Sequence, residues 1–186
     1  MIKLLEIVMI ISTFMYSYLI LYCKRSSFIY GIISSAIMTY ILVASEVYIQ
    51  SVLNVIYIIT YIYSFIVWKK QEDKLKISNI SIKGIVLSII YILAFTVIMG
   101  YTFDRIAAYP YLDAFSAACS MTAVFLLSKK IIQSSYVFLM SNIASIMIFC
   151  LTKAYSGIIT FIIYMVFNII RIFTWRDLKK KDELNT

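Results

Sequence analysis

The chain has 186 residues, of which 63% are hydrophobic, and its mean hydropathy is +0.94. A soluble fold of this length cannot bury so much apolar surface, so the composition predicts an all-α integral membrane protein. The net charge is +8, but no stretch resembles a basic soluble domain, and we expect no nucleic-acid partner. The chain lacks histidine, a metal-ligand cluster and a nucleophile–base pair, which argues against an enzyme, a bound metal or a cofactor.

Seven segments approach the length of about 20 apolar residues that a membrane-spanning helix needs. In chain order, the predicted spans are Ile2–Cys23, Ser27–Ser45, Val47–Trp68, Ile82–Tyr101, Asp113–Ser128, Ser134–Leu151 and Ala154–Trp175. The first span has one lysine and no small-residue cleavage site, so we interpret it as a retained helix and not as a signal peptide. The fifth is the shortest of the seven.

The predicted spans divide into groups of three, one and three. Residues 1–68 form the first three-helix group, and residues 69–83 a polar cytoplasmic linker. A single linking transmembrane helix follows at 84–101, and the second three-helix group occupies 102–175. Residues 176–186 are predicted to form a charged cytoplasmic tail.

The two groups of three share landmarks at an offset of about 107 residues. Three of these recur in order: Glu6 with Asp113, Ser26-Ser27-Phe28 with Ser134-Ser135-Tyr136, and Tyr57 and Trp68 with Tyr164 and Trp175. Because one helix separates the groups, both cross the membrane in the same direction. The pattern therefore predicts the parallel 3+1+3 repeat of SWEET-type carriers, in which the solute binds near the bilayer midplane between the repeats.

Basic residues are distributed very unequally between the two predicted membrane faces. Fourteen lie on the side of the C-terminus: Lys24, Arg25, Lys69, Lys70, Lys74, Lys76, Lys83, Lys129, Lys130, Arg171, Arg176, Lys179, Lys180 and Lys181. The other side has three, which are Lys3, Arg105 and Lys153. The positive-inside rule then predicts an external N-terminus and a cytoplasmic C-terminus.

Several motifs resemble those of the PnuC nicotinamide riboside transporters. The segment PYLDAFSAACSMTAVFLLSKK (110–130) resembles the Pro-Tyr-x-Asp-Ala-Phe opening and the basic end of that family's fifth helix. Asn142 falls on the Asn of the family's Trp-x-x-x-Asn pattern, with Phe138 in place of the Trp. GIIS (31–34) and YSFIVW (63–68) are further matches, so the resemblance extends over essentially the whole chain.

This resemblance implies a seven-helix SWEET/PnuC-like fold and import of nicotinamide riboside, an NAD precursor, across the bacterial cytoplasmic membrane. It also implies a homotrimer. The sequence contains no recognisable sodium site, proton relay or ATP-binding loop, so we expect facilitated diffusion. A nicotinamide mononucleotide is not expected to be carried, because its phosphate has no basic partner at midplane depth in the predicted spans.

Departures from the family pattern leave the solute open. Asn54 stands where the family usually has Gln, and Val124-Phe125 replaces a common Gln-Trp pair. Phe28 lies in a region that is usually richer in Trp and Pro. Thiamine, riboflavin or a deoxynucleoside is therefore an alternative solute, and a membrane sensor or assembly subunit without transport activity is a further alternative.

Polar and aromatic side chains within the spans are the candidate solute contacts. Asn142 lies in the middle of the apolar run 134–151, and its amide is costly to expose to lipid. It bonds either a solute or a neighbouring helix. Asn54 and Ser34, the repeat partner of Asn142 at an offset of 108, are the other predicted polar contacts. A pyridinium riboside also needs aromatic faces, for which the candidates are Phe138, Phe28, Tyr57, Phe125 and Tyr164; each of these alternatively packs the helices or lies at the membrane interface.

Overall fold

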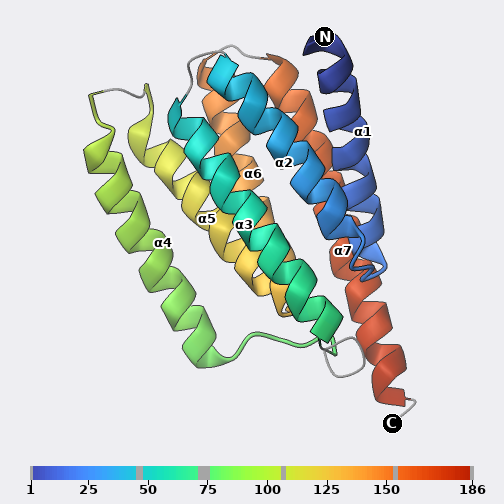
Figure 1. Ribbon diagram of the computed structural model, residues 1–186. Coiled ribbons are helices and arrows are strands. Elements are labelled where there is room, and N and C mark those ends of the chain that lie inside the picture. The colour runs from blue at the N-terminus through green and yellow to red at the C-terminus, as the bar shows by residue number, and fades with distance from the viewer. Residues whose placement is uncertain (1, 45–47, 71–75, 106–107, 153–154, 185–186) are drawn as a thin grey trace. The chain divides into compact units, whose positions relative to one another are not determined.

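The computed structural model describes residues 2–44, 48–70, 76–105, 108–152 and 155–184. Within these ranges the chain forms seven helices (Figure 1). They are α1 (Ile2–Leu21), α2 (Ser27–Ala44), α3 (Tyr48–Lys70), α4 (Ile82–Thr102), α5 (Pro110–Ser128), α6 (Ser134–Leu151) and α7 (Tyr155–Leu184). Over the described residues, α1, α4, α5 and α6 are long and apolar enough to cross a membrane.

The helices follow the predicted spans closely because apolar length determines both. The starts of α1, α2 and α4, the end of α5 and both ends of α6 coincide with the predicted bounds. The ends of α1, α3 and α4 and the start of α5 differ from them by one to three residues, and the C-terminal end of α7 differs by more. Three predicted bounds, Ser45, Val47 and Ala154, lie outside the described residues.

Two helices extend beyond their predicted bounds for identifiable reasons. Helix α5 starts at Pro110, because a proline suits the first helical position, where no backbone N–H is needed. Helix α7 continues through the segment predicted to be a charged tail and ends at Leu184. Lysine, glutamate and leucine favour helix, and Lys179 pairs with Glu183 one turn later at 3.6 Å.

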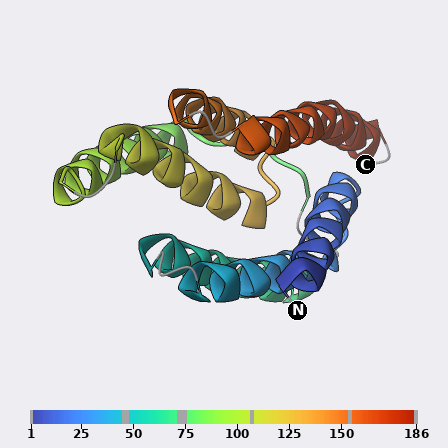
Figure 2. The same ribbon diagram turned by 90° about the horizontal axis from the view of Figure 1, so that it is seen from above.

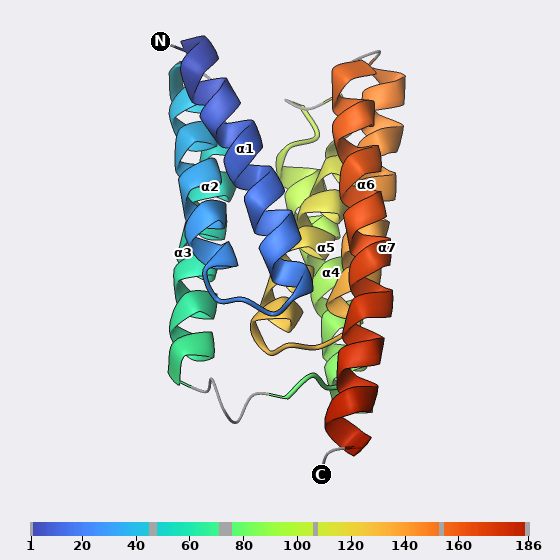
Figure 3. The same cartoon turned by 90° about the vertical axis from the view of Figure 1, so that its right-hand side faces the viewer.

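The chain forms two compact units. The first comprises residues 1–76 together with 128–130, and the second comprises 77–127 and 131–186. In the first unit α1 packs on α2, and α2 packs on α3 (Figure 2). In the second unit α6 and α7 lie side by side (Figure 3).

Aromatic residues form the interior of the first unit. Trp68 is 2% exposed and packs edge-on against Phe28, with ring centroids 4.9 Å apart. Its indole Nε1 donates a hydrogen bond to the carbonyl of Ser128 at 2.8 Å, and the Lys130 ammonium lies over its ring. These contacts satisfy the only polar atom of a side chain that is otherwise apolar.

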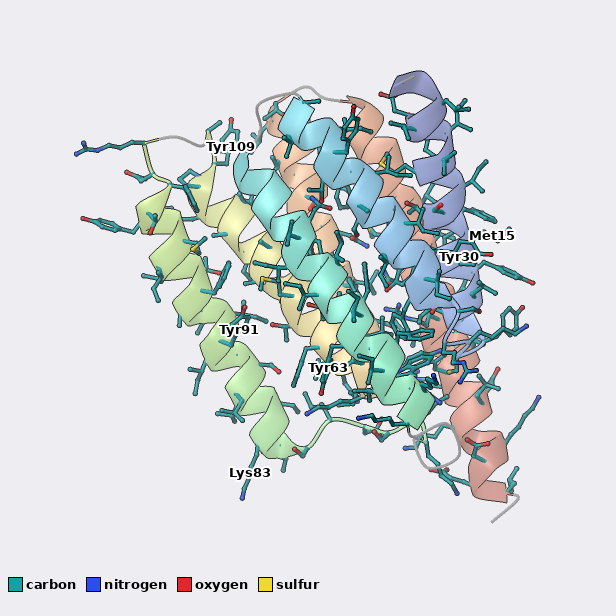
Figure 4. All side chains as sticks on the ribbon, viewed as in Figure 1. Met15, Tyr30, Tyr63, Lys83, Tyr91 and Tyr109 are labelled. Carbon is teal, nitrogen blue, oxygen red and sulfur yellow. The ribbon has the colours of Figure 1, made fainter. Side chains whose placement is uncertain are left out.

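In the second unit, the core of α4 and α5 is small and apolar. Ile92, Ala118 and Cys119 form it, with Phe95 and Phe115 packed against them. Most of the remaining α4 side chains are exposed apolar groups (Figure 4). A surface of this kind is expected to face lipid.

The α1–α2 and α5–α6 turns have the same backbone structure at an offset of 107 residues. Cys23 and Lys130 are the two non-glycine residues with positive φ in the described chain, at 53° and 52°. Lys24 N–H donates to Leu19 O, and Ile131 N–H donates to Leu126 O, in the same position of each turn. The turn thus recurs at the offset found between the sequence landmarks.

This turn generates a prediction about stability. The left-handed conformation costs an L-residue about 1–2 kcal/mol and costs glycine little. Cys23→Gly should therefore raise the free energy of unfolding by about 0.5–1 kcal/mol, as measured by circular dichroism during denaturation in mixed micelles. The matched control, Cys150→Gly in helical α6, should lower it by a similar amount. A loss of stability in Cys23→Gly would contradict the strained turn.

Candidate solute-binding site

Asn142 is buried in α6, as expected for an amide within an apolar span. The side chain is 4% exposed, and its Nδ2 group has no hydrogen-bond partner within the structure. A buried amide donor without an acceptor costs about 1–3 kcal/mol. The amide therefore has an unused donor that a bound solute can satisfy.

Serine side chains connect α5 with the face of α6 next to Asn142. Ser141 Oγ donates to the Ser116 carbonyl at 2.9 Å and lies 2.6 Å from Ser120 Oγ. Ser116 Oγ also lies 2.7 Å from Ser145 Oγ. The hydroxyls satisfy one another across the two helices, so this contact fixes the rotation of α6 that places Asn142.

Phe138 lies one turn before Asn142 and has a cationic neighbour. The Arg171 guanidinium of α7 is centred 5.1 Å from the Phe138 ring and 5.8 Å from the Trp175 ring. Arg171 Nε donates to Ser135 Oγ at 2.7 Å, and Nη2 donates to Asn168 Oδ1 at 2.7 Å. One approach to the Phe138 ring is thus already taken by protein.

Helical spacing brings these residues together. Ser135, Phe138 and Asn142 are spaced i, i+3, i+7 along α6, which places them on one face of the helix. Asn168, Arg171 and Trp175 have the same spacing along α7, which packs on α6. Asn168 in turn donates from Nδ2 to the Tyr164 carbonyl at 2.9 Å. We call these six residues, Ser135, Phe138, Asn142, Asn168, Arg171 and Trp175, the α6–α7 cluster.

The other two predicted contacts in the second unit lie outside this cluster. Tyr164 is half-buried on α7, where its ring meets Phe161 edge-on at 5.8 Å. Phe125 on α5 is 47% exposed.

The four predicted contacts in the first unit have different surroundings. Phe28 is 0% exposed and packs against Trp68 and Tyr61, so in this conformation it is a core residue with no face for a solute. Ser34 Oγ lies 2.6 Å from Thr13 Oγ1, a contact between α2 and α1. Asn54 and Tyr57 are half-buried on α3.

The sequence from residue 3 to residue 177 matches the model of the nicotinamide mononucleotide transporter family. The chain belongs to this family. Among solved structures, the crystal structure of the vitamin B3 transporter PnuC matches with a TM-score of 0.77 and 17% identity, covering 96% of this chain and 83% of that one. No curated protein matches. The fold is therefore that of PnuC, and the family match makes the chain a multi-pass membrane protein of a small-molecule transporter family.

In this member of the nicotinamide mononucleotide transporter family, sequence reasoning missed Arg171. Its position near the end of the last predicted span groups it with the basic residues of the C-terminal side, and that grouping does not reveal that its side chain is only 4% exposed inside the second unit. The available signal was its position within the apolar run 161–173, four residues before Trp175. Asn168 and Ser135 accept from Arg171 and are not among the predicted site residues. Asn168 has the same signal as Arg171, because it lies in the same apolar run, whereas Ser135 has none of its own.

Removing the buried guanidinium of Arg171 should destabilise this protein markedly. Arg171→Gln loses the charge-assisted bonds to Ser135 and Asn168, which should lower the free energy of unfolding by about 2–3 kcal/mol. The same substitution at exposed Arg105 should change it by about 0.5 kcal/mol or less. Denaturation in mixed micelles measures both free energies. Equal effects would show that the contacts of Arg171 in the α6–α7 cluster contribute nothing specific to stability.

Proposed function

We propose that the protein carries nicotinamide riboside across the membrane by facilitated diffusion. Membership of the nicotinamide mononucleotide transporter family over residues 3–177 carries this proposal. The fold shared with a vitamin B3 transporter supports it. The sequence signs of ion or ATP coupling are absent, so the solute gradient supplies the driving force.

Asn142 is proposed to hold the solute. Its unpaired Nδ2 donor suits a ribose or carboxamide oxygen, which would remove the cost of the unsatisfied amide. The partly exposed Phe138 ring next to it, on the same helix face, offers an apolar contact for the pyridinium ring. The alternative, a purely structural amide, predicts no change in solute binding when Asn142 is replaced.

A mononucleotide is the second candidate solute, and a specific observation favours it. The matching family is described by that solute, and Arg171 supplies a buried cation where the sequence predicted none. Two of the guanidinium nitrogens, however, already donate to Ser135 and Asn168. The phosphate of a mononucleotide would have to displace these bonds. The riboside has a neutral hydroxyl in place of that phosphate, and for this reason we favour the riboside as the solute.

Transport by purified protein in liposomes tests the proposal. Labelled nicotinamide riboside should equilibrate down its gradient without sodium, a proton gradient or ATP, and faster than labelled nicotinamide mononucleotide. Excess unlabelled thiamine should not compete. Competition by thiamine would transfer the assignment to another vitamin, and absence of any flux in correctly folded protein would favour a sensor or assembly subunit.

A variant series connects this flux to Asn142. Asn142→Leu removes the amide donor and should weaken riboside binding about tenfold, the upper range for one hydrogen bond, without loss of expression. Ile143→Leu, at the adjacent lipid-exposed position, is the matched control and should bind normally. Calorimetry on monodisperse protein measures both affinities. Unchanged affinity in Asn142→Leu would place the amide in a structural contact.

The assembly and orientation are also proposals. We propose a homotrimer in the bacterial cytoplasmic membrane, with the N-terminus outside and the C-terminus inside. If the buried Arg171 is not counted, the C-terminal side still has far more basic residues than the other side. The positive-inside rule therefore favours the same orientation.

Reporter fusions test the orientation. An enzyme that is active only in the cytosol should be active when fused after Thr186, and one that requires the periplasm should not. Strong activity of the periplasmic reporter at this position would reverse the proposed topology. Fusions after Lys76 and after Arg105 are internal controls, because the proposed topology places them on opposite sides.

A further inference from the structure

A hollow of about 330 Å³ lies in the second unit, outside the α6–α7 cluster. Three cations line it, Arg176, Lys179 and Lys180, all from the last turns of α7. Three uncharged polar residues, Asn79, Gln133 and Tyr136, and one carboxylate, Glu183, form the rest of the polar lining. We call this hollow the α7 basic pocket.

The wall formed by Asn79 and Gln133 is held by hydrogen bonds. Gln133 accepts the Ile80 backbone N–H at 3.0 Å through Oε1, and its Nε2 donates to Asn79 Oδ1 at 3.3 Å. The Ile132 N–H also donates to the Ser78 carbonyl at 3.1 Å. These bonds hold the segment before α4 against the start of α6, so this wall of the pocket has a defined position.

Arg176 is oriented by Tyr136. Its Nη2 donates to the Tyr136 hydroxyl at 2.6 Å, and the guanidinium lies 6.0 Å from the ring centroid. A guanidinium has five N–H donors, so the bond to Tyr136 leaves donors of its planar fork for a ligand. The tyrosine holds the side chain in place without neutralising its charge.

The charge balance of the lining favours an anion. Lys179 pairs with Glu183 at 3.6 Å, and Glu183 is the one carboxylate among the described lining residues. Three cations against one carboxylate leave the pocket net positive. A phosphate suits this arrangement, because its oxygens can accept from the arginine fork and from a lysine at the same time.

We propose that the α7 basic pocket binds a phosphate group, carried by an anionic phospholipid or by a soluble phosphate ester. The pocket begins one residue after Trp175, the last residue of the predicted span, so a lipid headgroup can reach it as readily as a soluble anion. Its volume is sufficient for a single phosphate group. The proposal is independent of the solute that the protein carries.

Binding by the purified full-length chain tests this proposal, with two probes that distinguish the sources. Native mass spectrometry counts phosphatidylglycerol retained against phosphatidylcholine. Titration with inorganic phosphate and adenosine monophosphate, followed by thermal unfolding, measures soluble anions. The test variant is Arg176→Gln with Lys180→Gln. The matched control is Lys83→Gln with Lys181→Gln, which removes two exposed positive charges outside the lining.

The pocket variant should bind its anion at least about tenfold more weakly than the control, the effect of losing one charge-assisted hydrogen bond. Lys180→Gln alone, at an exposed position that folding does not need, should weaken binding about two- to fivefold. Selective retention of phosphatidylglycerol identifies a lipid ligand, and saturable binding of the soluble probes identifies an ester. Equal weakening in both double variants, or no binding of any probe, would overturn the proposal.

Discussion

Hydrocarbon offers no hydrogen-bond partners, and this constraint governs how polar side chains are placed in this structure. Hydroxyl groups on the helices donate hydrogen bonds to backbone carbonyls four residues earlier, as Ser64 does to the carbonyl of Thr60. The Arg171 guanidinium donates hydrogen bonds to the side-chain oxygens of Ser135 and Asn168. Several buried hydroxyls and the Nδ2 group of Asn142 depart from this pattern, and Asn142 is the one amide among these exceptions in the described residues. A polar group left unpaired at this depth is a candidate for function.

The helices could be predicted from sequence because a span is specified by apolar length alone. The extension of α7 to Leu184 could not be read from hydropathy, because its last turns form through helix propensity and an ion pair between charged residues. The recurrence at 107 residues was visible in the landmarks. The paired turns at Cys23 and Lys130 have no sequence signature, since neither residue is the glycine or asparagine that usually marks positive φ.

The candidate site was predictable only in part, and the reason is that composition does not say which helix faces meet. Asn142 was identified because a lone amide in an apolar run is rare. Phe28 was chosen for its aromatic ring, but that ring is buried against Trp68. Counting basic residues by membrane side takes no account of burial, so it does not distinguish Arg171 from the exposed basic residues of the C-terminal side. Its contacts with Ser135, 36 residues away, depend on the packing of α6 against α7.

The length of α7 has a consequence for observing the protein at work. Thirty residues at about 1.5 Å per residue make a rod of about 45 Å, longer than the hydrocarbon layer of about 30 Å. Asn168 and Arg171 therefore share one continuous rod with the exposed turn at Lys180 and Lys181. A fluorophore attached to that turn would rotate with the buried residues, so the accessible end of the helix gives an optical readout of rearrangements in the interior.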